Sequence, residues 1–78
     1  MHTLKNIEVI PQYKLRCYFT DNQVKDVDLS SLITRTAFEF LKNSENFLKV
    51  KNKQYFVEWE GFDADLSADT LWHWNDLP

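Results

Sequence analysis

The stretch DLSSLITRTAFEFLK, from Asp28 to Lys42, is the segment whose apolar residues repeat at a helical spacing. Side chains at i, i+4, i+8, i+11 and i+12 share one stripe of an α-helix; here they are Leu29, Ile33, Ala37, Phe40 and Leu41. Thr34 and Thr36 are poor mid-helix residues because their χ1 angles are restricted. We therefore predict a short turn over residues 30–33, a break near residues 34–35, and a main helix that runs to the end of the stretch.

Alternation of apolar and polar residues predicts strands on both sides of this helix. In the clearest strand, from Tyr13 to Phe19, every second residue belongs to one apolar face. Further strands are predicted at residues 7–9, 24–28, 47–51 and 55–59, with a helical turn capped by Ser44 just before the strand at 47–51. Residues 60–67 are predicted to be a loop, after which Ser67 or Asp69 caps a short final helical turn. The order is β-β-β-α-β-β plus that turn, which indicates a mostly antiparallel α+β fold.

Length and composition indicate a single small domain over residues 1–78. The hydrophobic content of 44% is typical of a globular chain. Cys17 is the only cysteine, so no internal disulfide can form. No apolar run approaches the roughly 20 residues needed to span a bilayer, and the N-terminus lacks the apolar core of a signal peptide. We expect a soluble cytoplasmic protein.

Charge is unevenly distributed along the chain, whose formal net charge is −3. A basic segment carries Lys42, Lys49, Lys51 and Lys53 against a single Glu45. Residues 55–78 carry six carboxylates and neither Lys nor Arg. Because an acidic segment repels phosphates, we expect neither general nucleic-acid binding nor attraction to an anionic membrane.

The residues that carry catalysis or bind metals do not form a convincing pattern. Asp63, Asp65 and Asp69 have the oxygen ligands that hard cations need, but Ala68 and Trp74 replace the Gly and Glu of a calcium loop. Cys17 lies on the apolar face of its strand, so we expect an inert core thiol and not a catalytic one. Gly61 is the only glycine of the chain, whereas a phosphate-binding loop needs several. We expect no enzyme activity, no metal and no cofactor.

Aromatic residues concentrate in the acidic final third of the chain. Trp59 and Trp72 suit a small core, whereas other aromatics are harder to bury. Tyr and Trp are enriched at protein interfaces because they bury large areas at low entropic cost. We predict a partner-binding patch of Phe56, Phe62 and Trp74 ringed by Glu58, Glu60 and Asp63. Its partner would be a protein with a basic or apolar-centred face.

Several segments together resemble a known family over nearly the whole chain. They include Phe19-Thr20-Asp21, Val27-Asp28-Leu29-Ser30, Val57-Glu58-Trp59 and the tail from Asp65 to Trp72. The chain resembles the small bacterial family catalogued as domain of unknown function 2442. The resemblance implies a compact α+β domain from bacteria or their phages, encoded beside another small gene as in toxin–antitoxin pairs. It implies no catalytic residue, and the chain departs from the family pattern in the loop 60–64.

Three functions remain open from these observations. We expect a non-enzymatic protein-interaction module, the antitoxin-like or regulatory member of a small bacterial gene pair. One alternative is a nucleic-acid-associated regulatory accessory protein that uses the basic segment. Another is a phage-encoded inhibitor of a host defence complex, which would also act by binding a protein.

Overall fold

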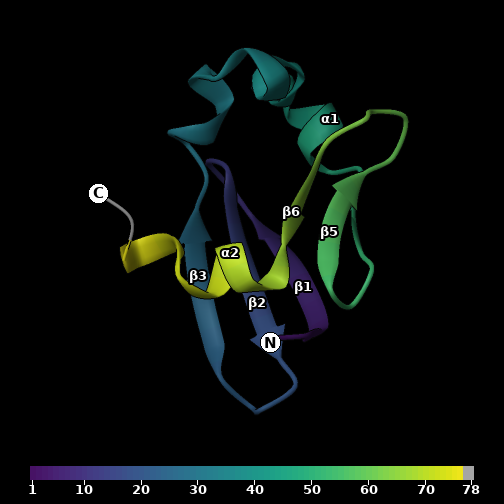
Figure 1. The fold of residues 1–78 in the computed structure, drawn as a ribbon. Coiled ribbons are helices and arrows are strands. Elements are labelled where there is room, and N and C mark those ends of the chain that lie inside the picture. Colours follow the sequence, from purple (N-terminus) through teal and green to yellow (C-terminus); the bar gives the residue numbers. More distant parts are fainter. Residues whose placement is uncertain (77–78) are drawn as a thin grey trace.

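The computed structural model describes residues 1–76, which form two three-stranded antiparallel sheets connected by short helices (Figure 1). The first sheet has the order β1-β2-β3, formed by Leu4–Ile10, Lys14–Phe19 and Val24–Asp28. The second has the order β4-β5-β6, formed by Val50–Asn52, Phe56–Trp59 and Asp65–Ser67. The helical elements are η1 (Leu32–Thr34), η2 (Thr36–Lys42), α1 (Ser44–Phe47), α2 (Ala68–Trp72) and η3 (Trp74–Asp76). The predicted α+β class and antiparallel pairing are confirmed.

The first sheet follows the predicted alternation. Leu15, Cys17 and Phe19 of β2 are buried, because successive side chains of a strand point to opposite faces. On the outer face Arg16 lies between two carboxylates, Glu8 of β1 and Asp26 of β3. The inner face of this sheet is therefore one wall of the core, and the outer face is polar.

The segment between the two sheets forms 3₁₀ helices, so the predicted main α-helix is wrong. Arg35 separates η1 from η2 with an extended backbone (φ −83°, ψ 140°), which confirms the predicted break. A 3₁₀ helix has three residues per turn, so side chains three apart share one face. The buried residues Leu29, Leu32 and Leu41 fit that period, as does the half-buried Phe38. Ile33 and Phe40, which belong to the predicted α-helical stripe, are also half-buried. Ala37, which belongs to the predicted α-helical stripe, is exposed.

The chain before the second sheet differs from the prediction at residues 43–49. Helix α1 forms as expected, but Asn43 caps it in place of Ser44, and the Asn43 side chain accepts from the Glu45 N–H at 2.9 Å. Leu48 keeps a helical backbone, and its N–H donates to the Ser44 carbonyl. Strand β4 therefore begins at Val50, and the predicted strand start at residue 47 is wrong.

Strand β6 replaces the end of the predicted loop. It pairs antiparallel with β5, and Leu66 is its buried residue. Ser67 then caps α2 as predicted, because its Oγ accepts the Thr70 N–H at 3.0 Å. The cap turns the chain from the second sheet into the helix.

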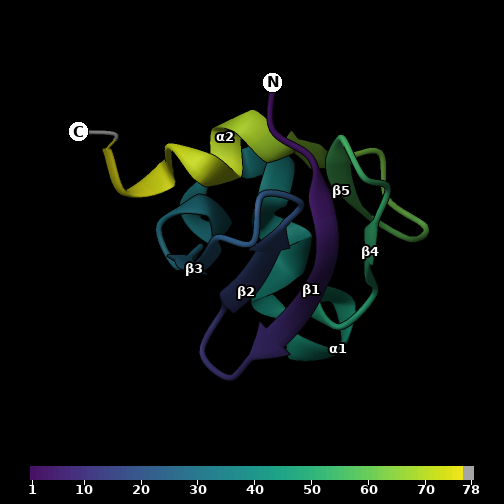
Figure 2. The same ribbon diagram turned by 90° about the horizontal axis from the view of Figure 1, so that it is seen from below.

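The two sheets meet at β1 and β4 and enclose one core (Figures 1 and 2). The Leu4 N–H donates to the Gln54 carbonyl at 2.7 Å, and the Asn52 side chain donates to the Leu4 carbonyl at 3.1 Å. Helix α2 crosses the inner face of the first sheet, while η1, η2 and α1 close one end (Figure 1). No helix within residues 1–76 is long and apolar enough to cross a membrane.

Candidate functional site

The structure separates the aromatic residues of the patch predicted from the sequence. Trp74 lies beside β3, where its Nε1–H donates to the Asp28 carbonyl at 2.8 Å. Phe62 lies in the loop between β5 and β6 and stacks on Phe40, with ring centroids 4.0 Å apart. These two places are on opposite sides of the molecule (Figure 1). Phe56 is half-buried on the outer face of β5, so Trp74 does not join it or Phe62 in one surface.

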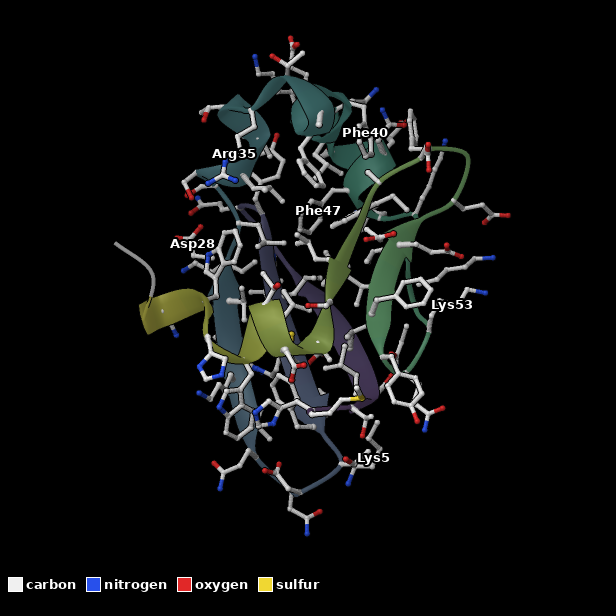
Figure 3. The ribbon with its side chains drawn as sticks, viewed as in Figure 1. Lys5, Asp28, Arg35, Phe40, Phe47 and Lys53 are labelled. Carbon is white, nitrogen blue, oxygen red and sulfur yellow. The ribbon has the colours of Figure 1, made fainter. Side chains whose placement is uncertain are left out.

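The acidic residues of the predicted patch face lysines of the basic segment. In the β4–β5 hairpin Lys51 pairs in register with Glu58. The Lys53 ammonium lies 3.5 Å from Glu58, and the Lys51 ammonium lies 3.0 Å from Glu60. Lys53 points outward beside β5 (Figure 3). The hairpin thus brings the basic and acidic segments together, and each offsets the field of the other.

Asp63, the remaining acidic residue of the predicted patch, is exposed in the loop between β5 and β6. Phe62, its neighbour in the chain, is half-buried and packs against the core. In addition, the Lys49 ammonium lies 5.8 Å from the centroid of the Phe62 ring. Phe62 is therefore held between Phe40 and a lysine, and it is less available to a partner than the sequence indicates.

A groove lies between the β1–β2 turn and α1, two segments that are neighbours in Figure 2. Its volume is about 290 Å³. The lining residues are mostly apolar: Val9, Ile10, Pro11, Gln12, Tyr13, Ser44, Phe47 and Leu48. Ligand sites in proteins are typically concave and mostly apolar, with a few polar groups at the margin. We therefore name this feature the turn groove and treat it as the candidate functional site.

The backbone of the β1–β2 turn shapes one wall of the turn groove. Gln12 and Tyr13 both have left-handed φ angles, 71° and 65°, which cost an L-residue about 1–2 kcal/mol each. In this conformation the Tyr13 hydroxyl donates to the Lys42 carbonyl at 2.7 Å, and the ring meets Phe47 edge to face. The strained turn therefore fastens the first sheet to α1.

The opposite wall of the turn groove comes from α1 and the residue after it. Phe47 is 3% exposed and points from α1 toward the interior (Figure 3), so it forms the floor. Leu48 is 63% exposed and stands at the margin. Its side chain points to solvent because Leu48 continues the helical turn instead of starting a strand.

The chemistry available at the turn groove is that of binding apolar groups. The polar lining side chains are an amide, Gln12, a hydroxyl, Ser44, and the Tyr13 phenol, which donates to the Lys42 carbonyl. Elsewhere, burial raises the pKa of the Cys17 thiol to about 12, so this thiol stays protonated at neutral pH. Within residues 1–76, no three His, Cys, Asp or Glu side chains come together as they would to hold a metal ion.

Sequence reasoning missed the turn groove because its residues come from two separate segments. Two signals were present in the chain. Pro11-Gln12-Tyr13 forms a turn without Gly, Asn or Asp, although such turns normally use those residues. Asn43 can cap the helical turn that ends just before Leu48. This signal places Leu48 at the end of a helix and not in the predicted strand at residues 47–51.

Comparison with known proteins places the chain in a family. The family model described as "Protein of unknown function (DUF2442)" matches residues 4–76. Neither a curated protein nor a solved structure matches the chain. The match extends from the first residue of β1 to the last described residue, so it includes both sheets and the turn groove. The chain therefore belongs to the DUF2442 family of proteins of unknown function.

Proposed function

We propose that this protein is a non-enzymatic protein-interaction module, the antitoxin-like or regulatory member of a small gene pair in the bacterial cytoplasm. The observation that carries the proposal is the turn groove with Leu48 at its margin. Four large apolar side chains within residues 1–76 are exposed: Met1, Val24, Leu48 and Tyr55. Of these, Leu48 alone lines the groove. An exposed apolar side chain beside an apolar hollow is a common mark of a protein-interaction site.

A nucleic-acid-associated role has less support. Phosphate contacts need lysines or arginines whose charge is available. Lys51 and Lys53 each lie within 4.0 Å of a carboxylate, so two of the four lysines in the basic segment are already paired. A phage-encoded inhibitor would use the same surface as a bacterial regulator, and the identity of the bound protein distinguishes these two roles.

The test is capture of a protein partner by three tagged forms of the full chain from a lysate of the source cells. Leu48→Asp puts a charge at the margin of the groove, and Val24→Asp makes the same change on β3, where Val24 is 52% exposed. We expect a stoichiometric partner with the wild type and with Val24→Asp, and at least a tenfold loss with Leu48→Asp. Circular dichroism checks that all three forms are folded.

Two other results would change the proposal. Partner binding that survives Leu48→Asp but is lost in Phe56→Ser would move the interface to the outer face of β5. Capture of nucleic acid alone would refute the interaction module and support the accessory role. Recovery of no macromolecule by any form would also count against the proposed function.

A further inference from the structure

Strand β3 is an edge of the first sheet, because it pairs with β2 alone. In an antiparallel pair, every second residue of a strand directs both its N–H and its C=O toward the neighbouring strand. The Leu29 N–H donates to the Tyr13 carbonyl at 2.8 Å, which fixes the phase of this alternation in the β2–β3 register. The backbone groups of Val24, Asp26 and Asp28 therefore point away from β2.

Trp74 supports this direction and closes one end of the edge. Its Nε1–H donates to the Asp28 carbonyl at 2.8 Å, so this outward acceptor takes its donor from outside the sheet. Within residues 1–76, no group bonds to the backbone N–H or C=O of Val24 or Asp26. Figure 1 shows β3 at the border of the first sheet, with no strand beyond it. The backbone groups of Val24 and Asp26 are thus available to an added strand.

The charges on the outer face of the sheet indicate which strand would fit. Glu8, Arg16 and Asp26 are direct cross-strand neighbours on β1, β2 and β3. The Arg16 guanidinium lies 3.8 Å from the Glu8 carboxylate and 2.8 Å from that of Asp26, so the charges alternate across the sheet. Two carboxylates against one guanidinium leave the row net acidic. A cation opposite Asp26 on the next strand would continue the alternation and neutralise the row.

The adjacent row of the outer face fits an apolar side chain. It contains Tyr18 of β2 and Val24 of β3, which lie opposite each other, and Val24 is 52% exposed. An aromatic or β-branched residue on an added strand would cover Val24. In an antiparallel strand, the residue opposite Val24 comes two positions after the residue opposite Asp26. The edge therefore fits a strand that reads cation, any residue, apolar residue.

A second copy of this chain fits the edge less well. If two β3 strands paired antiparallel so that all their outward groups met, Asp26 would lie opposite Asp26 of the other copy. Like charges at directly opposite positions are destabilising, and charged side chains on an edge strand commonly protect it against self-pairing. The edge therefore favours a strand of different sequence.

We propose that β3 accepts an extended segment of a partner protein as a fourth strand of the first sheet, antiparallel to β3, with Lys or Arg opposite Asp26 and an aromatic or β-branched residue opposite Val24. Backbone hydrogen bonds would hold the segment, and Trp74 would end the pairing at Asp28. None of the residues that line the turn groove belongs to β3, so this inference goes beyond the proposed function and does not depend on what binds in the groove.

The experiment selects ligands with a displayed library of random 8-residue peptides, enriched on the immobilised full chain. The Kd of the most enriched peptide is measured by fluorescence anisotropy, beside three versions that carry one backbone N-methyl group: at the cation, at the apolar residue, or between them. Four folded forms of the chain are compared: the wild type, Asp26→Lys, Glu8→Lys and Leu48→Asp. Glu8→Lys is the matched control, because Glu8 also pairs with Arg16 but lies on β1.

We expect enriched peptides with a cation two residues before an aromatic or β-branched residue. N-methylation at either of these residues should weaken binding at least tenfold, because both bond to β3, whereas N-methylation between them should change the Kd less than twofold. Asp26→Lys should weaken binding about fivefold at low salt, because an exposed ion pair becomes a repulsive contact. Glu8→Lys and Leu48→Asp should each change the Kd less than twofold. Val24→Asp, the control for the groove, should weaken this peptide and leave capture of the groove's partner unchanged.

Several results would overturn the inference. Peptides without the expected pattern, or no enrichment at all, would contradict the fit of the edge to such a strand. Equal effects of the three N-methyl groups would exclude strand addition, and sensitivity to Leu48→Asp but not to Asp26→Lys would assign the peptide to the turn groove. A dimer in sedimentation equilibrium that Val24→Asp dissociates would assign the edge to a second copy. The proposed function is judged separately, by Leu48-dependent capture, so either idea can fail alone.

Discussion

Trp59→Phe tests how the core accommodates an unpaired polar group. Trp59 is 1% exposed, and its Nε1–H has no hydrogen-bond partner among the described residues. Its indole lies among three phenyl rings, those of Phe38, Phe40 and Phe47, with ring centroids 6.2–6.3 Å away. The substitution therefore removes both apolar contacts and an unsatisfied donor, and these two changes have opposite effects on the free energy of unfolding.

The two effects are of similar size. Phenylalanine has three ring atoms fewer, and their lost burial costs about 2 kcal/mol at roughly 0.8 kcal/mol per buried methylene. Removing a buried N–H that lacks a partner recovers about 1–3 kcal/mol. We therefore expect Trp59→Phe to lie within about 1 kcal/mol of the wild type. Trp59→Ala, by contrast, should cost about 3–5 kcal/mol because it leaves a cavity.

Urea unfolding followed by far-ultraviolet circular dichroism measures both variants without depending on the lost tryptophan fluorescence. The slope of free energy against urea should stay unchanged, so the midpoint reports stability directly. A cost of about 2 kcal/mol or more for Trp59→Phe would refute the reasoning, since the lost packing alone would then account for the whole effect and removing the unpaired donor would have recovered nothing.

Three further outcomes follow from individual residues. Cys17, with its pKa raised to about 12 by burial, should resist iodoacetamide at pH 8 in the native protein and react readily in urea; rapid native alkylation would contradict its burial. The hydrogen bond from Arg16 lowers the pKa of Asp26, so the carboxylate stabilises the fold above its unfolded pKa and loses that effect as pH falls through the folded value. Asp26→Asn should therefore flatten the fall in Tm between about pH 5 and pH 2. An unchanged slope of Tm against pH would show that the Arg16–Asp26 pair does not cause this pH dependence. Ser67→Ala removes the cap on Thr70 and should cost about 1 kcal/mol, read as a Tm lowered by about 4–8 °C; Ser67→Asp, which keeps a capping oxygen, should restore it.

Strand positions were largely predictable from the sequence because strand alternation is local. Cys17 and Phe19 share a face with Leu15 wherever β2 lies in the fold, and the structure buries all three. The helical segment was harder, because Leu29 and Leu41 fit a period of 3.6 and also a period of three. The break at Arg35 divides the segment, and neither piece is long enough for the period to be read.

Strand β6 illustrates what a local pattern cannot supply. It has three residues, of which Leu66 is buried and the two flanking residues are exposed. One apolar residue between two polar ones is common in loops, so the pattern carries no strand signal. The strand exists because β5 offers a free edge whose register matches Leu66 with Val57, and that partner lies outside any short sequence window.

Charge along the chain was a poor guide to charge in space for a similar reason. The acidic final third and the basic segment before it are consecutive, and a hairpin folds one directly against the other. Runs of opposite charge separated by a tight turn therefore tend to cancel on the folded surface, since cross-strand neighbours are only about 5 Å apart. Lys42 precedes the hairpin, whereas Lys49 lies just before β4 and its carbonyl accepts the Glu60 N–H at 3.1 Å.

The turn groove breaks local rules of the chain, and so does the β4–β5 turn, where Gln54 also has a left-handed φ of 75° and the next residue, Tyr55, is exposed. Gln12 and Tyr13 occupy left-handed backbone positions that Gly or Asn would fill at lower cost, and Leu48 exposes a large apolar side chain at the same site. Neither feature contributes to the stability of the fold, because the left-handed residues are strained and the exposed Leu48 side chain buries little apolar area. Departures from local consistency gather at functional sites, where their cost is offset by binding. On this reasoning, Gln12→Gly should stabilise the fold and leave the apolar floor intact, while Leu48→Asp should leave the fold intact and remove partner binding.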